Sequence, residues 1–182
     1  MGLLNTIDTG ILNFIYSRTR NALFDILMPF ISRMGNGGAV WVLSALLLLF
    51  MPNYSKCGLA MAISLILCVV IGNLTLKPLF ARTRPCDLNP AITLLIRRPT
   101  DYSFPSGHTM SSFAAATILL LSHKELGMLA MILASLIAFS RLYLYVHHPS
   151  DILVGALIGI AIARVVMPMM PFVSIWTASS HA

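Results

Sequence analysis

The sequence has 182 residues, of which 58% are hydrophobic and 10% are charged, and its mean hydropathy is +0.86. Soluble globular domains carry about 25% charged residues, so this composition excludes an ordinary soluble domain and indicates an integral membrane protein. The net charge of +6 fits either loops that face anionic lipid or a site for an anionic substrate. The length suits a single domain over residues 1–182 with about five or six helical spans.

The N-terminal region, before residue 34, predicts two amphipathic helices. Apolar residues recur at helical spacing, first at Leu4, Ile7, Ile11, Phe14 and Ile15, and then at Leu23, Phe24, Leu27, Phe30 and Ile31. The first stretch fits a helix that lies in the membrane interface. The second stretch fits either an interfacial helix or a short sixth span, and Asp25 inside it argues against a full span.

Five apolar stretches predict the membrane spans, namely residues 34–55, 57–76, 109–122, 126–140 and 152–163. The third stretch is short unless Gly107 and His108 belong to its first turn. Pro149 suits the first turn of the fifth helix, because proline is tolerated there. We therefore expect an all-α integral membrane bundle of about six helices, in which the N-terminal segments contribute the remainder.

The order of these spans places three polar segments on one face of the membrane. If the second span ends near Lys77, the third begins on that side, the fourth returns to it, and the fifth leaves from it. The segments that meet there are residues 77–85, 106–108 and 140–151. Besides the C-terminus, the opposite face receives only Lys56, His123, Lys124 and Glu125.

The converging segments supply cations and hydrogen-bond donors that suit a phosphate group. The candidate phosphate ligands are Lys77, Arg84, Ser106, Gly107 and Arg141. Arginine offers a planar fork that binds phosphate oxygens in pairs, and lysine offers a point charge. A helix N-terminus adds backbone N–H groups and the positive end of its dipole. A single well-placed carboxylate among cations makes a poor Mg²⁺ site, so we expect neither a metal nor a cofactor.

The histidines suit phosphoryl transfer. Pro149 in the first helical turn places Asp151 in that turn and His147 just before it. Asp151 can then accept a hydrogen bond from one ring nitrogen of His147, which fixes the tautomer and makes the other nitrogen a nucleophile. His108, from a different helix, can protonate the leaving oxygen. These residues predict in-line transfer of a phosphoryl group to His147, followed by attack of water.

Three motifs cover residues 77–151 in order: Lys77, six residues, then Arg84-Pro85; Pro105-Ser106-Gly107-His108; and Ser140-Arg141, five residues, His147, three residues, Asp151. This pattern resembles the type 2 phosphatidic acid phosphatase superfamily of membrane lipid phosphatases, which is related to the vanadium haloperoxidases. The resemblance implies a six-helix bundle. It also implies the same nucleophile, orienting carboxylate, general acid and phosphate ligands that the residues themselves suggest.

Within that family, the short chain and the stretch "RPCDLNP…SFPSGHT" are most similar to small bacterial undecaprenyl pyrophosphate phosphatases. The resemblance thus implies metal-independent conversion of undecaprenyl pyrophosphate to undecaprenyl phosphate through a phosphohistidine. Phosphatidylglycerophosphate, phosphatidate and lipid A phosphatases share the motifs and stay open as alternatives. The expected partners are a lipid mono- or diphosphate and the bilayer, with no nucleic acid, and the oligomeric state is not predicted.

Two other classes of function compete with the phosphatase. A haloperoxidase would hold vanadate in the same cradle, and the membrane spans argue against it. A transporter or lipid-binding protein built on the same bundle would keep its function after a His147→Ala substitution, whereas a phosphatase would lose nearly all turnover.

Several polar residues near the motifs have open roles. The arginines outside the motifs are Arg82, Arg97 and Arg98, and they fit lipid-headgroup anchoring at least as well as substrate contact. His148 fits a structural neighbour of His147. Tyr143 and Tyr145 predict part of an aromatic belt at the membrane interface.

The orientation of the chain follows from the lysines away from the motifs. Cations that bind phosphate should not be counted by the positive-inside rule. Lys56 and Lys124 then favour a cytoplasmic location for the face opposite the motifs. The sequence therefore predicts a multi-pass protein of the bacterial plasma (inner) membrane with its site facing the outside or periplasm.

Overall fold

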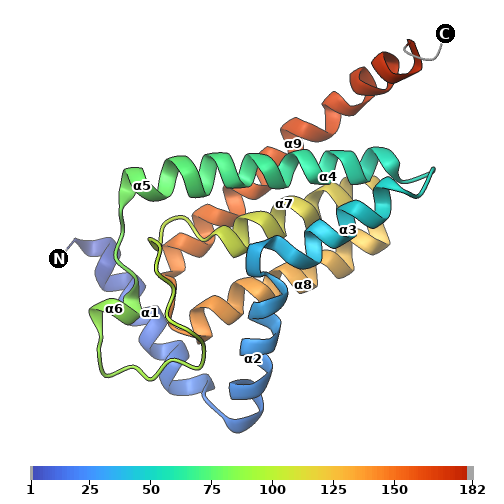
Figure 1. Ribbon diagram of the computed structural model, residues 1–182. Coiled ribbons are helices and arrows are strands. Elements are labelled where there is room, and N and C mark those ends of the chain that lie inside the picture. Colours follow the sequence, from blue (N-terminus) through green and yellow to red (C-terminus); the bar gives the residue numbers. More distant parts are fainter. Residues whose placement is uncertain (1, 180–182) are drawn as a thin grey trace.

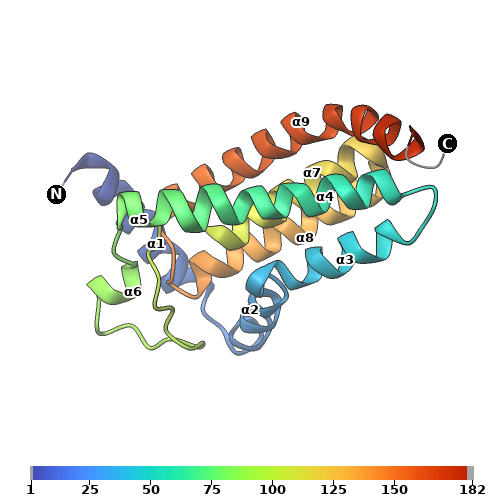
Figure 2. The same cartoon turned by 45° about the horizontal axis from the view of Figure 1, so that its top comes forward.

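The computed structural model describes the backbone of residues 2–179 and the side chains of residues 2–170 (Figure 1). Every regular element in the described backbone is a helix, which confirms the predicted all-α membrane bundle. The helices that run alongside one another in Figure 2 are α3 (Ala39–Leu49), α4 (Ser55–Cys68), α7 (Gly107–Ser122), α8 (Lys124–Tyr143) and α9 (Pro149–Ser179). The shorter elements α5 (Lys77–Phe80) and α6 (Pro85–Leu88) lie at one end of this bundle, beside α1 (Leu3–Thr19) (Figures 1 and 2).

Helix α7 packs against α4, α8 and α9, and small residues let these backbones approach closely. A Cβ atom placed on Gly127 would lie 2.1 Å from Cα of Leu120, and one on Gly159 would lie 2.3 Å from the carbonyl oxygen of Met110. The alanines at 114–116 on α7 are fully buried. Small residues at helix contacts are typical of membrane bundles, in which packing rather than burial from water drives association.

The later four predicted spans are confirmed as helices, and the structure shows at which residues they begin and end. Gly107 and His108 do form the first turn of α7, and Pro149 begins α9. Three stretches are long and apolar enough to cross a membrane, namely Ser55–Leu88, Lys124–Tyr143 and Pro149–Met170. Helix α7, with 16 residues, lies among them at the centre of the bundle.

The first predicted span, residues 34–55, is wrong in its extent. Its straight helical part is only α3, because Gly37 and Gly38 adopt left-handed backbone angles with φ of 58° and 69°. These glycines lie in the short 3-10 turn η1 (Asn36–Gly38), which joins α3 to α2 (Ala22–Met34). The pair α2 plus α3 is bent by 48° and passes as a fourth span only when its two parts are taken together. We call η1 with the preceding Gly35 the elbow.

Helix α2 does not reach the length of a span alone and does so only together with α3, as a broken span or a re-entrant segment. The charge of Asp25 is compensated, since its carboxylate pairs with Arg20 (Nε to Oδ1, 2.9 Å) and accepts a hydrogen bond from the Tyr143 hydroxyl. Tyr143 is fully buried, and so is Tyr145, whose hydroxyl donates to Asn13 at 2.6 Å. The predicted interfacial belt is thus wrong for both tyrosines, because they hold the end of α8 to α2 and α1.

Helix α1 is amphipathic, as predicted, with its polar side turned toward the protein. Its exposed large apolar residues are Leu3, Leu4, Ile7, Ile11 and Phe14. Its buried residues are Asp8 and Leu12, which are 2% and 1% exposed. An apolar outer face on a membrane protein fits contact with lipid at the interface.

Candidate active site

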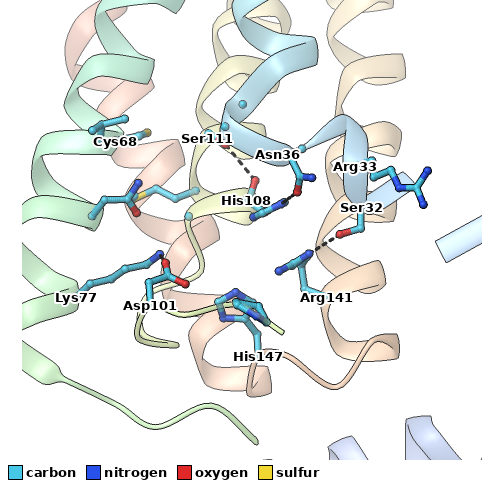
Figure 3. Close-up of a pocket in the computed structure, with 18 of the residues that line it drawn as sticks. Ser32, Arg33, Asn36, Cys68, Lys77, Asp101, His108, Ser111, Arg141 and His147 are labelled. Atoms are coloured by element: carbon cyan, nitrogen blue, oxygen red, sulfur yellow. Dashed lines mark hydrogen bonds and ion pairs between the residues drawn. The ribbon is translucent and has the colours of Figure 1, made fainter. Parts of the chain in front are cut away.

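The three predicted polar segments meet around one cavity of about 960 Å³, which confirms their convergence. Of the predicted site residues, the cavity is lined by Lys77, Arg84, Gly107, His108, Arg141 and His147. Figure 3 shows Lys77 of the first segment, His108 of the second, and Arg141 and His147 of the third around this space. Ser106 and Asp151 do not line it and lie behind it instead.

The local conformation of the first segment explains how Lys77 reaches the cavity. Helix α4 continues as a π-helix, η2 (Val69–Leu76), before α5 begins at Lys77. A π-helix shifts the faces of a helix relative to regular α-helical spacing and is frequent at functional sites. Gly72 in η2 lies against Met110 of α7, since a Cβ atom there would be 2.0 Å from Cε of that methionine. The close approach brings Lys77 next to the start of α7.

His147 is buried at the base of the cavity, in the loop between α8 and α9. Its Nε2 atom lies 3.1 Å from Nη1 of Arg84. Burial lowers the pKa of His147 to about 3, and the charges of Arg84 and Arg141 act in the same direction, against the opposing effect of Asp151. The imidazole is therefore neutral at neutral pH. Because a guanidinium only donates, Nε2 accepts and Nδ1 carries the proton.

Asp151 is fully buried and faces the other side of His147. Its Oδ2 atom is 3.6 Å from Nδ1 of His147, which is longer than the predicted hydrogen bond. Within the described part of the chain, that Nδ1 atom has no hydrogen-bond partner. The carboxylate is held by others: Oδ2 accepts from the backbone N–H of His148 at 2.8 Å, and Oδ1 accepts from Nη1 of Arg82 at 2.6 Å.

Arg84 is buried, and its guanidinium group is held by several acceptors. Nη1 donates to the carbonyl oxygen of Val146 at 2.6 Å, and Nε donates to the carbonyl oxygen of Asp101 at 2.8 Å. Nη2 donates to Oδ1 of Asp101 at 2.7 Å. These bonds fix the plane of the guanidinium beside Nε2 of His147.

Asp101 is a site residue that the sequence reasoning missed. Its carboxylate pairs with both Lys77 and Arg84, as Figure 3 shows for Lys77, although its side chain is 52% exposed. Burial opposes ionisation, but the hydrogen bonds and charges of the two cations hold the pKa of this carboxyl well below its usual range. An anionic group therefore lies between two of the predicted phosphate ligands. The sequence signal that could have identified Asp101 as a site residue is its position six residues before Gly107.

Ser106 and Gly107 differ in what they offer the cavity. Ser106 is the N-cap of α7, and its buried hydroxyl oxygen accepts from the backbone N–H of Thr109 at 3.5 Å and from the Thr109 hydroxyl at 3.0 Å. Gly107 lines the cavity, where a Cβ atom would lie 3.1 Å from Oδ1 of Asn73 and 3.9 Å from Nζ of Lys77. The absence of a side chain at Gly107 keeps that space open.

His108 and Arg141 each touch the elbow region. Nε2 of His108 is 2.9 Å from Oδ1 of Asn36. A Cβ atom on Gly35 would lie 2.8 Å from Cδ2 of His108, so the elbow packs directly on this ring. Arg141 donates through Nη1 to the hydroxyl of Ser32, while its buried Nε has no partner within the described residues. Figure 3 shows both contacts. Asn36 was missed because residues 34–55 predicted an uninterrupted span, and Ser32 was missed because its contact with Arg141 joins segments far apart in the sequence.

The structure places the residues with open roles in two groups, those that line the cavity and those that do not. Arg82 pairs with Asp8 and Asp151 and does not line the cavity, so neither lipid anchoring nor substrate contact describes it. Exposed Arg97 and Arg98 line the cavity, and Arg98 pairs with Asp87 at 3.1 Å. Buried His148 has Nε2 3.3 Å from the carbonyl oxygen of Thr83, away from the cavity.

The protein is an all-helical membrane bundle with a cation-lined cavity around a buried neutral histidine, and these features are typical of a membrane phosphatase. The sequence model of the PAP2 superfamily matches residues 53–174, and the protein belongs to that superfamily. An undecaprenyl-diphosphatase of Sulfolobus acidocaldarius is 39% identical over 134 residues, which are 73% of this chain and 64% of that relative. The match thus spans less than two thirds of that relative's length.

Two further similarities extend the comparison over more of the chain. A lipid A 4′-phosphatase of Bacteroides thetaiotaomicron is 28% identical over 170 residues, covering 86% of this chain and 73% of the relative. The crystal structure of a transmembrane PAP2-type phosphatidylglycerolphosphate phosphatase from Bacillus subtilis matches with a TM-score of 0.75 at 22% identity. That match covers 93% of this chain and 87% of the other, and it establishes the shared fold.

Proposed function

We propose that this protein is an integral membrane phosphatase that removes a phosphoryl group from a lipid phosphate, with an isoprenyl diphosphate such as undecaprenyl diphosphate as the first candidate substrate. The observation that carries the proposal is the neutral imidazole of His147, whose Nε2 lies 3.1 Å from the Arg84 guanidinium in a cavity that also receives Lys77 and Arg141. A nucleophilic nitrogen surrounded by fixed cations suits attack on a phosphoryl group.

In the first step, Nε2 of His147 attacks phosphorus, and the bond from phosphorus to the leaving oxygen breaks. The incoming phosphoryl oxygens replace Nε2 as the acceptor of the Arg84 Nη1 hydrogen bond and free the nitrogen lone pair. The leaving oxygen takes the bonding electron pair and receives a proton from His108, which enters this step as the imidazolium and leaves it neutral. Lys77, Arg84, Arg141 and the backbone N–H of Gly107 stabilise the charge on the remaining oxygens.

In the second step, His108 accepts a proton from a water molecule whose oxygen attacks the phosphohistidine. The bond between phosphorus and Nε2 breaks, inorganic phosphate leaves, and the nitrogen lone pair of His147 is restored. Throughout both steps, the Nδ1 proton of His147 faces Asp151, and closing the 3.6 Å gap between them stabilises the imidazole while it carries the phosphoryl group. Ser106 supports this arrangement as the cap of α7 rather than as a direct phosphate ligand.

The donor set supports a mechanism without a metal ion. The side chains that line the cavity near His147 are mainly cations, and the carboxylate of Asp101 is already engaged by two of them. Mg²⁺ prefers several oxygen ligands and substrate phosphates, and a cluster of cations would repel it. We therefore propose that turnover persists in EDTA.

The rest of the cavity supports an amphiphilic substrate. Besides the cations, it is lined by apolar residues of α3, α4 and η2, namely Val42, Leu65, Ile66 and Val69. A charged headgroup site that continues into an apolar surface fits a lipid phosphate. The similarity to an undecaprenyl-diphosphatase favours the isoprenyl diphosphate, and the longer match to a lipid A 4′-phosphatase supports a lipid A phosphate as the second candidate.

We also propose that the site faces the outside of the cell membrane. Lys56 and Lys124 lie at the start of α4 and α8, at the end of the bundle away from α5 and α6 (Figure 1). Labelling of cysteines introduced at positions 95 and 124 in intact cells tests this orientation. Reaction of an impermeant reagent at 95 alone supports it, and reaction at 124 alone overturns it.

Phosphate release by the purified full-length protein in EDTA tests the function. The panel contains undecaprenyl diphosphate, phosphatidylglycerophosphate, phosphatidate and a lipid A 4′-phosphate. We expect the highest kcat/KM with undecaprenyl diphosphate and a loss of at least about 10⁴-fold in His147→Gln. Inactivity of the wild type on every lipid, strict Mg²⁺ dependence, or an active His147→Gln variant would contradict the proposal. A preference for the lipid A phosphate would change the substrate and keep the reaction.

A further inference from the structure

A buried ion network joins α1 to the rear of His147. Nη2 of Arg82 donates to Oδ2 of Asp8 at 2.7 Å, and Nη1 of the same guanidinium donates to Oδ1 of Asp151 at 2.6 Å. Asp8 also accepts from the backbone N–H of Ser150 at 2.9 Å and from the Ser150 hydroxyl. Asp8 comes from the N-terminal helix, which precedes the region that the PAP2 model matches.

The network places one guanidinium between two buried carboxylates, so hydrogen bonds and a helix dipole compensate the remaining negative charge. Asp8 and Asp151 are 2% and 0% exposed, and an ionised carboxylate removed from water needs a cation or several hydrogen bonds. Arg82 bridges the two carboxylates with different nitrogens of one rigid fork. Both carboxylates also lie at the N-terminal turn of α9, where the helix dipole favours negative charge.

The network determines how Asp151 faces His147. Arg82 holds Oδ1, and the backbone N–H of His148 holds Oδ2, so the carboxylate plane is set without any contribution from His147. In this orientation Oδ2 points toward Nδ1 of His147 across 3.6 Å. Rotation of the carboxylate would turn Oδ2 away from that proton.

We infer that Asp8 and Arg82 are positioning residues for the nucleophile, and that they act on His147 only through Asp151. This inference rests on the proposed phosphoryl transfer. Arg82 fixes the Asp151 carboxylate, and Asp8 fixes Arg82 and the first turn of α9. Helix α1 is consequently part of the catalytic unit, even though none of its residues lines the cavity.

The test compares kcat and KM for Arg82→Gln, Asp8→Asn and the control Leu12→Ala in the purified full-length protein. Leu12 is the buried apolar residue of α1, so its truncation weakens the packing of α1 on the protein but leaves the ion network in place. We expect kcat to fall roughly 10- to 100-fold in Arg82→Gln and about 3- to 10-fold in Asp8→Asn, with KM within about twofold of wild type. Leu12→Ala should keep kcat and lower only the melting temperature.

Double variants separate positioning from folding. In an Asp151→Asn background, Arg82→Gln and Asp8→Asn should reduce kcat by no more than about twofold further, because the group through which they act is already altered. If Arg82→Gln does not fold, Arg82→Lys serves instead, since it keeps the charge but loses the fork that bridges two carboxylates.

Three outcomes would overturn the inference. An undiminished effect of Arg82→Gln or Arg82→Lys in the Asp151→Asn background would show action independent of Asp151. A raised KM with unchanged kcat would show substrate contact, and an equal loss of kcat in Leu12→Ala would show a general effect of α1. Inactivity of the wild type on the whole lipid panel would instead refute the proposed function, and the positioning role with it.

Discussion

The two sides of His147 differ in their charge balance. On the cavity side, Lys77, Arg84 and Arg141 face one carboxylate among the residues whose side chains are described, that of the half-exposed Asp101. On the rear side, two fully buried carboxylates share one guanidinium and a helix N-terminus. The front thus keeps excess positive charge and an accessible space, whereas the rear is closed and carries no excess positive charge. The contrast separates binding of an anion from orientation of the nucleophile, and substitutions on each side should change different kinetic constants.

Among substitutions on the two sides of His147, the largest effect is expected from removing a cation of the cavity side. Arg141→Gln removes a buried cation of the cavity lining whose Nε has no hydrogen-bond partner among the described residues, so kcat/KM should fall about 10²- to 10³-fold. Arg97→Gln is the matched control, because exposed Arg97 lines the same cavity at its edge and should change kcat/KM by less than about threefold. Steady-state kinetics on the best lipid of the panel measures both. Equal losses in the two variants would show that buried Arg141 contributes no more to phosphate binding than exposed Arg97.

The next effect concerns the pH dependence of stability. The pKa of His147 is about 3 in the folded protein and near 6.5 when unfolded, so between these values the unfolded chain binds the extra proton. Stability is fully present above about pH 6.5 and is lost as the pH falls toward 3, by at most about 1.4 kcal/mol for each pH unit. Melting temperatures measured from pH 7 to pH 4 should therefore decrease.

The His147→Gln variant serves as the control for this pH effect, since glutamine does not titrate. Its melting temperature should change less steeply over the same pH range. A slope identical to that of the wild type would show that His147 is not the group responsible.

The smallest effect is expected at Asp101. Asp101→Asn removes the anion that already pairs with Lys77 and Arg84, so inorganic phosphate and vanadate should inhibit about 3- to 10-fold more strongly. Asp87→Asn is a suitable control, because this carboxylate pairs with Arg98, which is not one of the predicted phosphate ligands. Weaker inhibition in Asp101→Asn would show that Asp101 holds the cations in place rather than competing with the ligand.

The cavity side of the site was largely predictable from the sequence. Lys77, Arg84, His108, Arg141 and His147 stand at fixed spacings next to long apolar stretches, and the alternation of spans brings them to one end of the bundle. Spacings and apolar stretches of this kind can be recognised in the sequence without knowledge of tertiary contacts. The helix starts at Gly107 and Pro149 were readable for the same reason, since caps and prolines act locally.

The rear side and the elbow were not predictable, because they depend on contacts between distant segments. Asp8 and Arg82 are 74 positions apart, and Asn36 and His108 are 72 apart. The break at Gly37 and Gly38 was hidden by an uncharged run that satisfies the length of a span. Tyr143 and Tyr145 were misassigned since an aromatic residue near a helix end is equally compatible with an interfacial belt and with buried hydroxyl contacts.

The apolar lining of the cavity has a consequence for how reaction rates should be expressed. Val42, Ile66 and Val69 line the cavity, and they remain 41%, 62% and 48% exposed. An apolar, exposed part of the cavity lining thus comes from α3, α4 and η2, which suits entry of a lipid from the membrane. A lipid that enters there diffuses in two dimensions, so the rate depends on its mole fraction in the membrane. Diluting the substrate with inert lipid at constant bulk concentration should lower the velocity, whereas diluting whole vesicles at fixed composition should leave turnover per enzyme unchanged.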